Sequence, residues 1–236
     1  MPAGKKNVII LGATSGIGKE MALWFAERGW RVGIAGRRKN LLNEIHAQNP
    51  DYLIPQAIDI RSEKSLISGL KKLEKTLGEI DIFIISSGTG FINSDFDNAL
   101  EQETISTNVV GFTTAVNWGY KYFEQRKEGT LATITSVGGL LGTAEGSAYS
   151  ATKAYQIIYL NGLQKRAAKT KIKIVDIRPG SVNTSMMKGE GHFWISTPAK
   201  AADVACRAII KGKRIQYVTP RWKFIGFVLK LLGLFN

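Results

Sequence analysis

Short apolar segments alternate along the chain with longer segments whose apolar residues follow a helical period. After the first apolar segment, Ile17, Met21, Trp24 and Phe25 recur at i, i+4, i+7 and i+8, which is the spacing of one helix face. Further predicted helices are Ser65–Leu77 and Tyr149–Ala168, and the predicted strands are Asn7–Leu11, Arg31–Ala35, Tyr52–Ile58, Ile80–Ser86, Thr130–Thr135 and Lys171–Ile177, with a short seventh at Gln216–Val218.

This order of elements predicts one doubly wound α/β domain. Strands that alternate with helices of this length form parallel βαβ units. The strand segments are apolar on both faces, as a sheet covered by helices on both sides requires. We therefore expect a single domain over residues 1–220, with a Rossmann-type, mostly parallel sheet and helices on both faces, and an apolar, basic tail over residues 221–236. Ligands of such sheets bind at the carboxyl ends of the strands.

Composition narrows the classes of partner and ligand. The formal net charge of +13 suits nucleic acid, an anionic lipid surface or a phosphorylated ligand, and it also serves solubility alone. No nucleic-acid-binding module is recognised, so nucleic acid is not an expected partner. Because the chain has two histidines, His46 and His192, and one cysteine, Cys206, neither a metal site nor an internal disulfide is expected. The apolar run Val8–Leu11 is too short for a signal peptide and no segment has the length of a membrane span, so we expect a cytoplasmic protein.

The segment LGATSGIGKE, which follows the first predicted strand, has the features of a phosphate-binding turn. Glycines allow a tight turn and a close approach of the backbone to a ligand, and the following helix directs free N–H groups at a pyrophosphate. The spacing G-x3-G-x-G differs from the commoner G-x-G-x-x-G, and a strand–turn–helix connection without a ligand is the alternative interpretation. The residues expected to contact the pyrophosphate are Gly12, Thr14, Ser15, Gly16, Ile17 and Gly18.

Basic residues after the second predicted strand favour NADP(H) over NAD(H). A cofactor with a free ribose 2′-hydroxyl is usually held by an acid at this point, whereas this chain has Arg37 and Arg38. Guanidinium groups suit a 2′-phosphate, which they can bind in bidentate fashion. After the third strand, Asp59 and Ile60 are expected at the adenine, although Asp59 could instead cap the helix that begins near Ser62.

Tyr149 and Lys153, in the segment SAYSATKAY, stand one turn apart on the same face of a predicted helix. A free phenol has a pKa near 10, and useful proton exchange near pH 7 requires a decrease of about three units, or about 4 kcal/mol. A unit charge about 4 Å away supplies about 4 kcal/mol at an effective dielectric constant near 20. We therefore predict that Lys153 lowers the pKa of Tyr149. The alternative is an aromatic residue that only packs in the core.

Further motifs complete a recognisable pattern. They are GATSGIG, the position of Asp59, TNVVG, Ser136 at the end of the fifth predicted strand, YSATK, and RPGSVNT at residues 178–184. With these motifs the chain resembles the short-chain dehydrogenase/reductases over nearly its whole length. The resemblance implies that Tyr149 is the general acid/base and that Lys153 lowers its pKa and binds the nicotinamide ribose. It also implies that Ser136 holds the substrate oxygen and that Asn108 anchors a proton relay through a water near Lys153. The residues that it places along the nicotinamide are Pro179, Gly180, Val182 and Thr184.

One segment departs from the pattern of the family. Members usually show N-N-A-G after the fourth strand, where this chain has Ser86, Ser87 and Gly88, and Leu11 replaces the usual threonine before Gly12. Gly88 still permits the close approach to the adenosine ribose that the resemblance implies for Ser87 and Gly88. We expect these changes to affect cofactor affinity and to leave the proton-transfer residues intact.

The implied activity is that of an NADP(H)-dependent carbonyl reductase or alcohol dehydrogenase acting on a small-molecule carbonyl or alcohol, with residues 1–220 as the dinucleotide-binding and catalytic domain. Met186, Met187, Phe193 and Trp194 would form an adaptable apolar lid, which favours an apolar or bulky substrate, or would simply close on the core. The alternative function is a non-catalytic dinucleotide-binding sensor, and the intact catalytic set argues against it. Because the family is usually dimeric or tetrameric, we expect a homodimer or a homotetramer.

The tail leaves three roles open. From Trp222 to Phe235 it is apolar apart from Lys223 and Lys230. As a helix it would be about 21 Å long, which is short of the roughly 30 Å hydrocarbon core of a bilayer. It could lie peripherally on a membrane surface with help from nearby basic residues, dock on a neighbouring subunit, or cover the substrate cleft.

Overall fold

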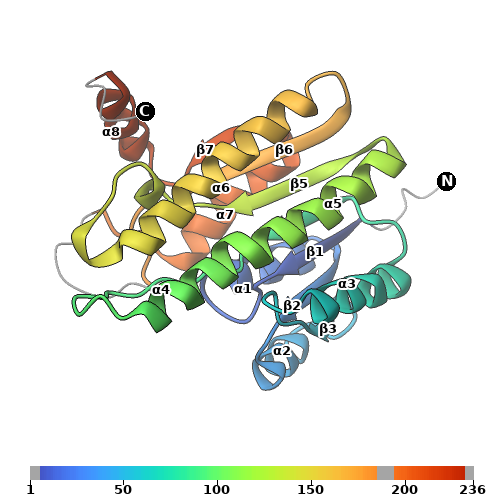
Figure 1. Cartoon of the computed structure of the whole chain (residues 1–236). Helices are drawn as coiled ribbons and strands as arrows, with labels where there is room; N and C mark the ends of the chain where they lie inside the picture. Colours follow the sequence, from blue (N-terminus) through green and yellow to red (C-terminus); the bar gives the residue numbers. More distant parts are fainter. Residues whose placement is uncertain (1–5, 185–193, 232–236) are drawn as a thin grey trace.

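The computed structural model describes residues 6–184 and 194–231 of the chain. Its centre is a seven-stranded sheet with the strand order β3-β2-β1-β4-β5-β6-β7, in which every neighbouring pair is parallel (Figure 1). The strands are β1 (Asn7–Leu11), β2 (Arg31–Gly36), β3 (Leu53–Ala57), β4 (Ile82–Ile85), β5 (Glu128–Ile134), β6 (Lys171–Arg178) and β7 (Ile215–Tyr217). The seven predicted strands are therefore confirmed, with bounds within two residues of the prediction.

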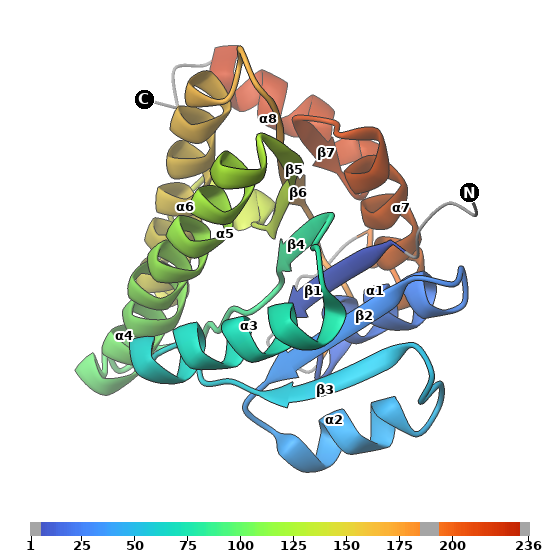
Figure 2. The same cartoon turned by 90° about the vertical axis from the view of Figure 1, so that its right-hand side faces the viewer.

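Helices cover both faces of the sheet, as predicted. Figure 2 shows α3, α5 and α6 on one side and α1 and α7 on the other. The α-helices are α1 (Gly16–Ala26), α2 (Lys39–His46), α3 (Glu63–Leu77), α4 (Asn98–Ile105), α5 (Phe112–Arg126), α6 (Ser147–Arg166), α7 (Pro198–Lys211) and α8 (Pro220–Leu231). A π-helical turn, η1 (Ser106–Gly111), joins α4 to α5, and two short 3-10 turns, η2 (Val137–Gly139) and η3 (Ala144–Gly146), precede α6.

Each face of the sheet has its own hydrophobic core, and β1 contributes to both. Val8 and Ile10 pack with α1 and α7, whereas Ile9 and Leu11 pack with α3 and α5. Successive side chains of a strand point to opposite faces, so a strand covered on both sides must be apolar throughout. This is the physical reason for the uninterrupted apolar run at the start of the chain.

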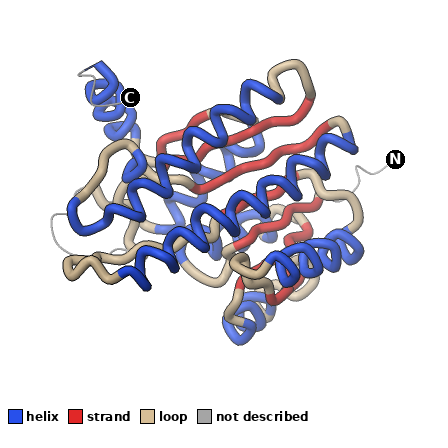
Figure 3. Tube along the Cα trace, in the orientation of Figure 1, coloured by secondary structure: helices blue, strands red, loops and turns tan. Residues whose placement is uncertain are grey.

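The order of the strands reverses at β1. From β1 the chain first extends the sheet through β2 and β3, and then returns to build β4, β5, β6 and β7 on the other side. A doubly wound sheet opens a crevice at this point, outside the carboxyl ends of its strands. Long loops gather at one end of the molecule, next to α8 (Figure 3). They include the segments after β4 and β5 that carry predicted site residues.

Helix α8 packs against these loops. A Cβ added to Gly180 would lie 2.7 Å from Cε2 of Trp222, and one added to Gly226 would lie 3.3 Å from the side chain of Leu140. Trp222 also meets Trp194 edge to face, with ring centroids 5.7 Å apart. These contacts place α8 against the segments after β5 and β6. Within the described residues, no helix is both long and apolar enough to cross a bilayer. The other predicted lid residues, Met186, Met187 and Phe193, lie outside the described residues.

Candidate functional site

The glycines after β1 are required by the packing of the turn. Gly12 has a φ of 95°, and a Cβ there would lie 2.7 Å from Cα of Ser87. A Cβ on Gly18 would lie 3.0 Å from the carbonyl carbon of Gly12. Gly16, with a φ of 55°, lies against Thr184, whose Cγ2 would be 3.1 Å from a Cβ at this position. The turn therefore brings Thr184 and the segment after β4 against the start of α1.

The N-terminus of α1 is electropositive. In the part of the chain that the structure describes, its N-cap residue Ser15 makes no side-chain cap hydrogen bond, and its first turn holds no acid. The N–H groups at such a helix start carry partial positive charge and need partners. Arg38 adds a full charge, because its Nη2 donates to Oγ1 of Thr14 at 2.6 Å and to Oγ of Ser15 at 2.8 Å. Arg37 is exposed, and Ile17 packs against the hydrophobic core.

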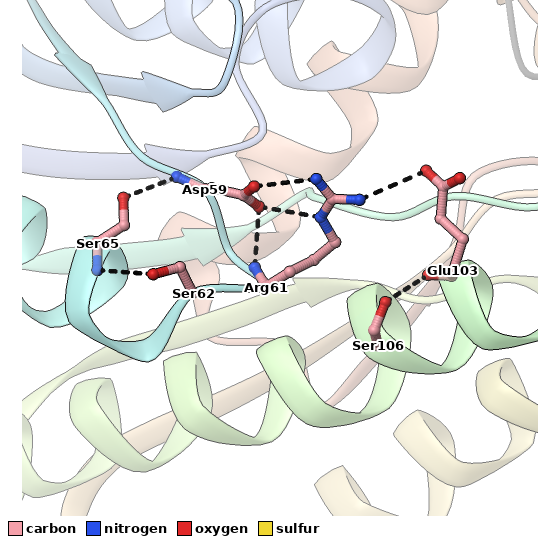
Figure 4. Close-up of polar contacts among 6 residues, drawn as sticks. All are labelled: Asp59, Arg61, Ser62, Ser65, Glu103 and Ser106. Carbon is pink, nitrogen blue, oxygen red and sulfur yellow. Dashed lines mark hydrogen bonds and ion pairs between the residues drawn. The ribbon is translucent and has the colours of Figure 1, made fainter.

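Asp59 is paired with Arg61 (Figure 4). Its carboxylate accepts hydrogen bonds from Nε and Nη2 of Arg61 at 3.2 and 3.0 Å, and from the Arg61 backbone N–H at 3.0 Å. The hydrogen bond from the Arg61 side chain is the main reason that the pKa of Asp59 lies below its usual value. The N-cap of α3 is Ser62, whose hydroxyl accepts from the N–H of Ser65 at 3.2 Å. The alternative that Asp59 caps this helix is therefore wrong.

Asn108, which is fully buried in η1, holds the loop after β4. Its Oδ1 accepts from the N–H of Thr89 at 3.0 Å, and its Nδ2 donates to the carbonyl of Thr89 at 2.7 Å and to Oγ1 of Thr152 at 3.1 Å. A Cβ on Gly88 would lie 3.5 Å from Oδ1 of Asn108 and 3.4 Å from Nζ of Lys153. The backbone at Gly88 therefore lies against two of the predicted catalytic residues, Asn108 and Lys153.

The ring of Tyr149 lies between two glycines. A Cβ on Gly90 would lie 3.0 Å from its Cγ, and one on Gly138 would lie 3.1 Å from its Cε1. Ser136 follows β5, and its Oγ accepts from the N–H of Gly138 at 2.9 Å, which leaves the hydroxyl hydrogen to donate elsewhere. The hydroxyl of Ser136 also acts on the Tyr149 phenol and lowers its pKa. The hydroxyl predicted to hold a substrate oxygen, that of Ser136, and the predicted general acid/base, Tyr149, are therefore neighbours.

Lys153 is buried, and its ammonium binds acceptors other than the phenol. Nζ donates to the carbonyl of Ile134 at 3.2 Å and to Oε1 of Gln156 at 3.0 Å, and it lies 5.9 Å from the centroid of the Tyr149 ring. Burial lowers the pKa of Lys153 to about 8, although the negative charge of Asp176 acts in the opposite direction.

The pKa of Tyr149 moves in the direction opposite to the sequence prediction. Burial of the phenol raises it, and the hydrogen bond with Ser136 offsets only part of that effect. The prediction assumes a cation about 4 Å from the hydroxyl, whereas the ammonium of Lys153 is bonded to Ile134 and Gln156. The predicted lowering is therefore wrong for the protein without a ligand, in which the phenol is protonated at neutral pH.

Sequence reasoning misses a buried polar chain beside this site. Asp176, on β6, accepts from Nε of Arg178 at 2.6 Å and from Oγ1 of Thr135 at 2.5 Å, and Nη1 of Arg178 donates to the hydroxyl of Tyr217 at 3.2 Å. Two charges at i and i+2 within an apolar strand share one face, which is a detectable signal. Gln156 is also missed, although it stands seven residues after Tyr149 on the same face of α6.

The segment after β6, which holds the residues expected along the nicotinamide, connects the surroundings of Ser136 with the phosphate turn. The carbonyl of Pro179 accepts from the N–H of Val137, next to Ser136, at 2.9 Å. Val182 forms a parallel bridge with Ser196, and Thr184 reaches the phosphate turn at Gly16. The segment therefore runs from the serine to the helix start that would hold a pyrophosphate.

These residues fit a nicotinamide dinucleotide. The start of α1 with Arg38 suits the phosphates, Gly88 leaves room beside Lys153 for a ribose, and the hydroxyls of Ser136 and Tyr149 suit a carbonyl oxygen. The groups come from five separate segments, and the fold brings them to one edge of the sheet.

Comparison with solved structures supports the fold. A variant of actinorhodin polyketide ketoreductase with NADPH superposes with a TM-score of 0.82 at 20% identity, covering 91% of this chain and 95% of that one. A short chain dehydrogenase from Burkholderia cenocepacia in complex with NADP has a TM-score of 0.84 at 18% identity, covering 96% and 93%. A 3-ketoacyl-(acyl-carrier-protein) reductase from Brucella melitensis complexed with NADH has a TM-score of 0.81 at 21% identity, covering 90% and 96%.

Sequence comparison reaches the level of family. The family model described as short chain dehydrogenase matches residues 6–193. An uncharacterized oxidoreductase from Staphylococcus haemolyticus is 31% identical over 181 residues, which cover 75% of this chain and 78% of the relative. Another from Myxococcus xanthus is 28% identical over 186 residues, covering 77% and 74%. The chain therefore belongs to the short-chain dehydrogenase family of oxidoreductases.

Proposed function

We propose that this protein is an NADP(H)-dependent carbonyl reductase, with Tyr149 as its general acid. The observation that carries the proposal is the position of a protonated phenol between Gly90 and Gly138, next to the hydroxyl of Ser136, with a buried lysine one helical turn away. A dinucleotide sensor has no need of this arrangement.

The proposed chemistry follows from the hydrogen-bonding capacity of each group. The bound nicotinamide would supply a hydride to the carbonyl carbon. Ser136 donates its hydroxyl hydrogen to the carbonyl oxygen and holds that oxygen beside Tyr149, which transfers its proton to it. The raised pKa of Tyr149 suits this direction, because the phenol must carry a proton before the step. The nearby ammonium of Lys153 stabilises the phenolate that the step produces.

Arg38 supports the preference for NADP(H). Its guanidinium lies over Thr14 and Ser15 at the start of α1, and Arg37 stands next to it in the sequence. A ribose 2′-phosphate there would meet the guanidinium of Arg38, with that of Arg37 next to it in the sequence, and no carboxylate from the first turn of α1. The similar solved structures contain NADPH, NADP and, in one case, NADH.

Exposed apolar side chains support an apolar or bulky substrate. Leu141, Trp194 and Ile195 are 45%, 37% and 52% exposed, and Trp194 contacts α8 through Trp222. Single exposed apolar residues are ordinary on a protein surface, and a ligand that covered these side chains would be apolar or bulky.

A second exposed apolar stripe supports a homodimer. Val110 of η1 and Ile158 of α6 are 57% and 65% exposed, and Tyr155 lies on the same helix at 36%. Because α6 also carries Tyr149 and Lys153, pairing of this face between two copies would stiffen the helix that holds the catalytic set. Light scattering should give a dimer or tetramer mass that falls in Ile158→Glu.

NADPH oxidation across a panel of ketones, aldehydes and 3-oxoacyl thioesters, with and without anionic lipid vesicles, tests the proposed function. We expect turnover with apolar carbonyls, and NADPH preferred over NADH. A requirement for vesicles would support membrane contact through the exposed Phe224, Arg221 and Lys223 of α8. Binding of NADPH without turnover of any carbonyl would instead favour the sensor.

A further inference from the structure

A glutamine side chain joins two groups of the catalytic set. Gln156 is buried on α6, three residues after Lys153 and seven after Tyr149, so the three residues lie along one face of the helix. Its Oε1 accepts from Nζ of Lys153 at 3.0 Å, and its Nε2 donates to the backbone carbonyl of Asn108 at 2.8 Å. The amide therefore forms a direct bridge from the ammonium to the π-helical turn η1.

The chemistry of the partners fixes the orientation of the amide. A carbonyl oxygen only accepts and an ammonium only donates. If the amide were turned over, its oxygen would face the Asn108 carbonyl and its N–H groups would face Lys153, and both hydrogen bonds would be lost. The side chain is 1% exposed, so water could not replace those bonds without rearrangement.

The bridge stands where the family resemblance implies a water between Asn108 and Lys153. We propose that Gln156 is a positioning residue that takes the place of this water and sets the position and charge state of Lys153. The proposal rests on the proposed function, because the role of Lys153 in the reaction depends on it. With one N–H on Ile134 and one on Gln156, the ammonium has a third donor to offer to Tyr149 or to a ribose hydroxyl.

Other charges around Lys153 are few and identifiable among the described residues. The Tyr149 ring lies on the same helix, 5.9 Å from Nζ. Asp176 on β6 attracts the ammonium, and its charge is shared with Arg178 at 2.6 Å. Substitution of Gln156 leaves all three of these groups in place, so it changes the environment of Lys153 by one hydrogen-bond acceptor.

Titration of Lys153 in the cofactor-free protein tests the proposal. We would follow lysine side-chain NMR signals with pH in the wild type, Gln156→Met and Gln156→Glu, and assign Lys153 by its absence in Lys153→Met. Loss of the acceptor should lower the titration midpoint by about one pH unit in Gln156→Met, and a carboxylate should raise it by at least as much in Gln156→Glu. Shifts of the Lys153 midpoint in opposite directions require a direct effect on the ammonium, because a loss of structure would shift the midpoint of both variants in the same direction.

Gln164→Met is the matched control. Gln164 is buried on the same helix and donates to the carbonyls of Ile174 and Arg214 at 3.2 and 2.7 Å, whereas the ammonium of Lys153 donates to Ile134 and Gln156. Its substitution should destabilise the fold to a similar extent and leave the midpoint of Lys153 unchanged. The proposal would be overturned if the Lys153 midpoints of the wild type, Gln156→Met and Gln156→Glu agreed within about 0.3 pH units, which is on the order of the precision of such a titration. Because no cofactor or substrate is present, this result is independent of whether the protein reduces carbonyls.

Discussion

Gly90→Ala should slow the chemical step more than it weakens cofactor binding. A methyl group at this position would lie 3.0 and 3.1 Å from Cγ and Cε2 of Tyr149 and still closer to Cδ2, so that atom must move by about 1 Å to reach ordinary van der Waals contact. The loop cannot easily yield, because Asn108 holds Thr89 by two hydrogen bonds. The ring of Tyr149 is therefore expected to move.

A displacement of about 1 Å in a reacting group costs on the order of 100-fold in rate, or about 2.7 kcal/mol. We expect kcat for carbonyl reduction to fall by about that factor, whereas the Kd for NADPH, measured by fluorescence, should change less than threefold, well under about 1 kcal/mol. Gly142→Ala, in the segment between β5 and α6, is the control, since nothing lies within 4 Å of a Cβ at that position. A folded Gly90→Ala protein that retains the kcat of the wild type would refute the placement of the Tyr149 ring.

Three further predictions concern the cofactor, the buried lysine and the C-terminal helix. Arg38→Ala should weaken NADPH binding by about 10- to 100-fold and NADH binding by less, since only NADPH carries the 2′-phosphate, whereas the lost hydrogen bonds to Thr14 and Ser15 affect the turn that both cofactors would use. Equal losses for both cofactors would contradict this role. Lys153 titrates near 8 in the folded chain and at 10.5 when unfolded, so between those values the unfolded state binds the extra proton and the stability of the wild type rises with pH. The free energy of unfolding of the wild type, relative to that of Lys153→Met, should therefore increase by about 3 kcal/mol from pH 8 to 10.5 and stay constant below pH 8. Chemical denaturation of both proteins across this range measures it. If the lysine were not desolvated, the difference between the two free energies would not change with pH. Gly180→Ala should cost about 1–3 kcal/mol by forcing a methyl group into Trp222, and Trp222→Ala should cancel most of that cost in the double variant; additive effects in thermal unfolding would place α8 away from Gly180.

The fold was open to prediction because its determinants are local and repeated. The apolar pattern of Asn7–Leu11 is enough to predict a buried strand. The spacing of Gly12 and Gly18 is enough to predict the turn that follows it. Tyr149 and Lys153 are one helical turn apart in any helix, so their shared face follows from the sequence.

The electrostatics of the site were not open to prediction in the same way. The hydrogen-bond partners of Lys153 come from β5 and from Gln156, and the length of a helical turn does not reveal that the ammonium binds these two acceptors. The direction of the Tyr149 pKa then follows from burial, which depends on loops that close over the ring at Gly90 and Gly138. Asp176 and Arg178 differ from this case. Their spacing on a predicted strand can be seen in the sequence, whereas the burial of their ion pair cannot.

Comparison of wild type and Tyr149→Phe at equal cofactor occupancy tests the central claim most directly. Each protein would first be titrated with NADPH, and initial rates would then be measured with the best carbonyl of the panel at matched saturation. The account predicts that Tyr149→Phe binds NADPH as tightly as the wild type and loses at least about 100-fold in kcat, in keeping with the contribution of a positioned general acid. Turnover by Tyr149→Phe at the rate of the wild type would contradict the assignment of the proton donor.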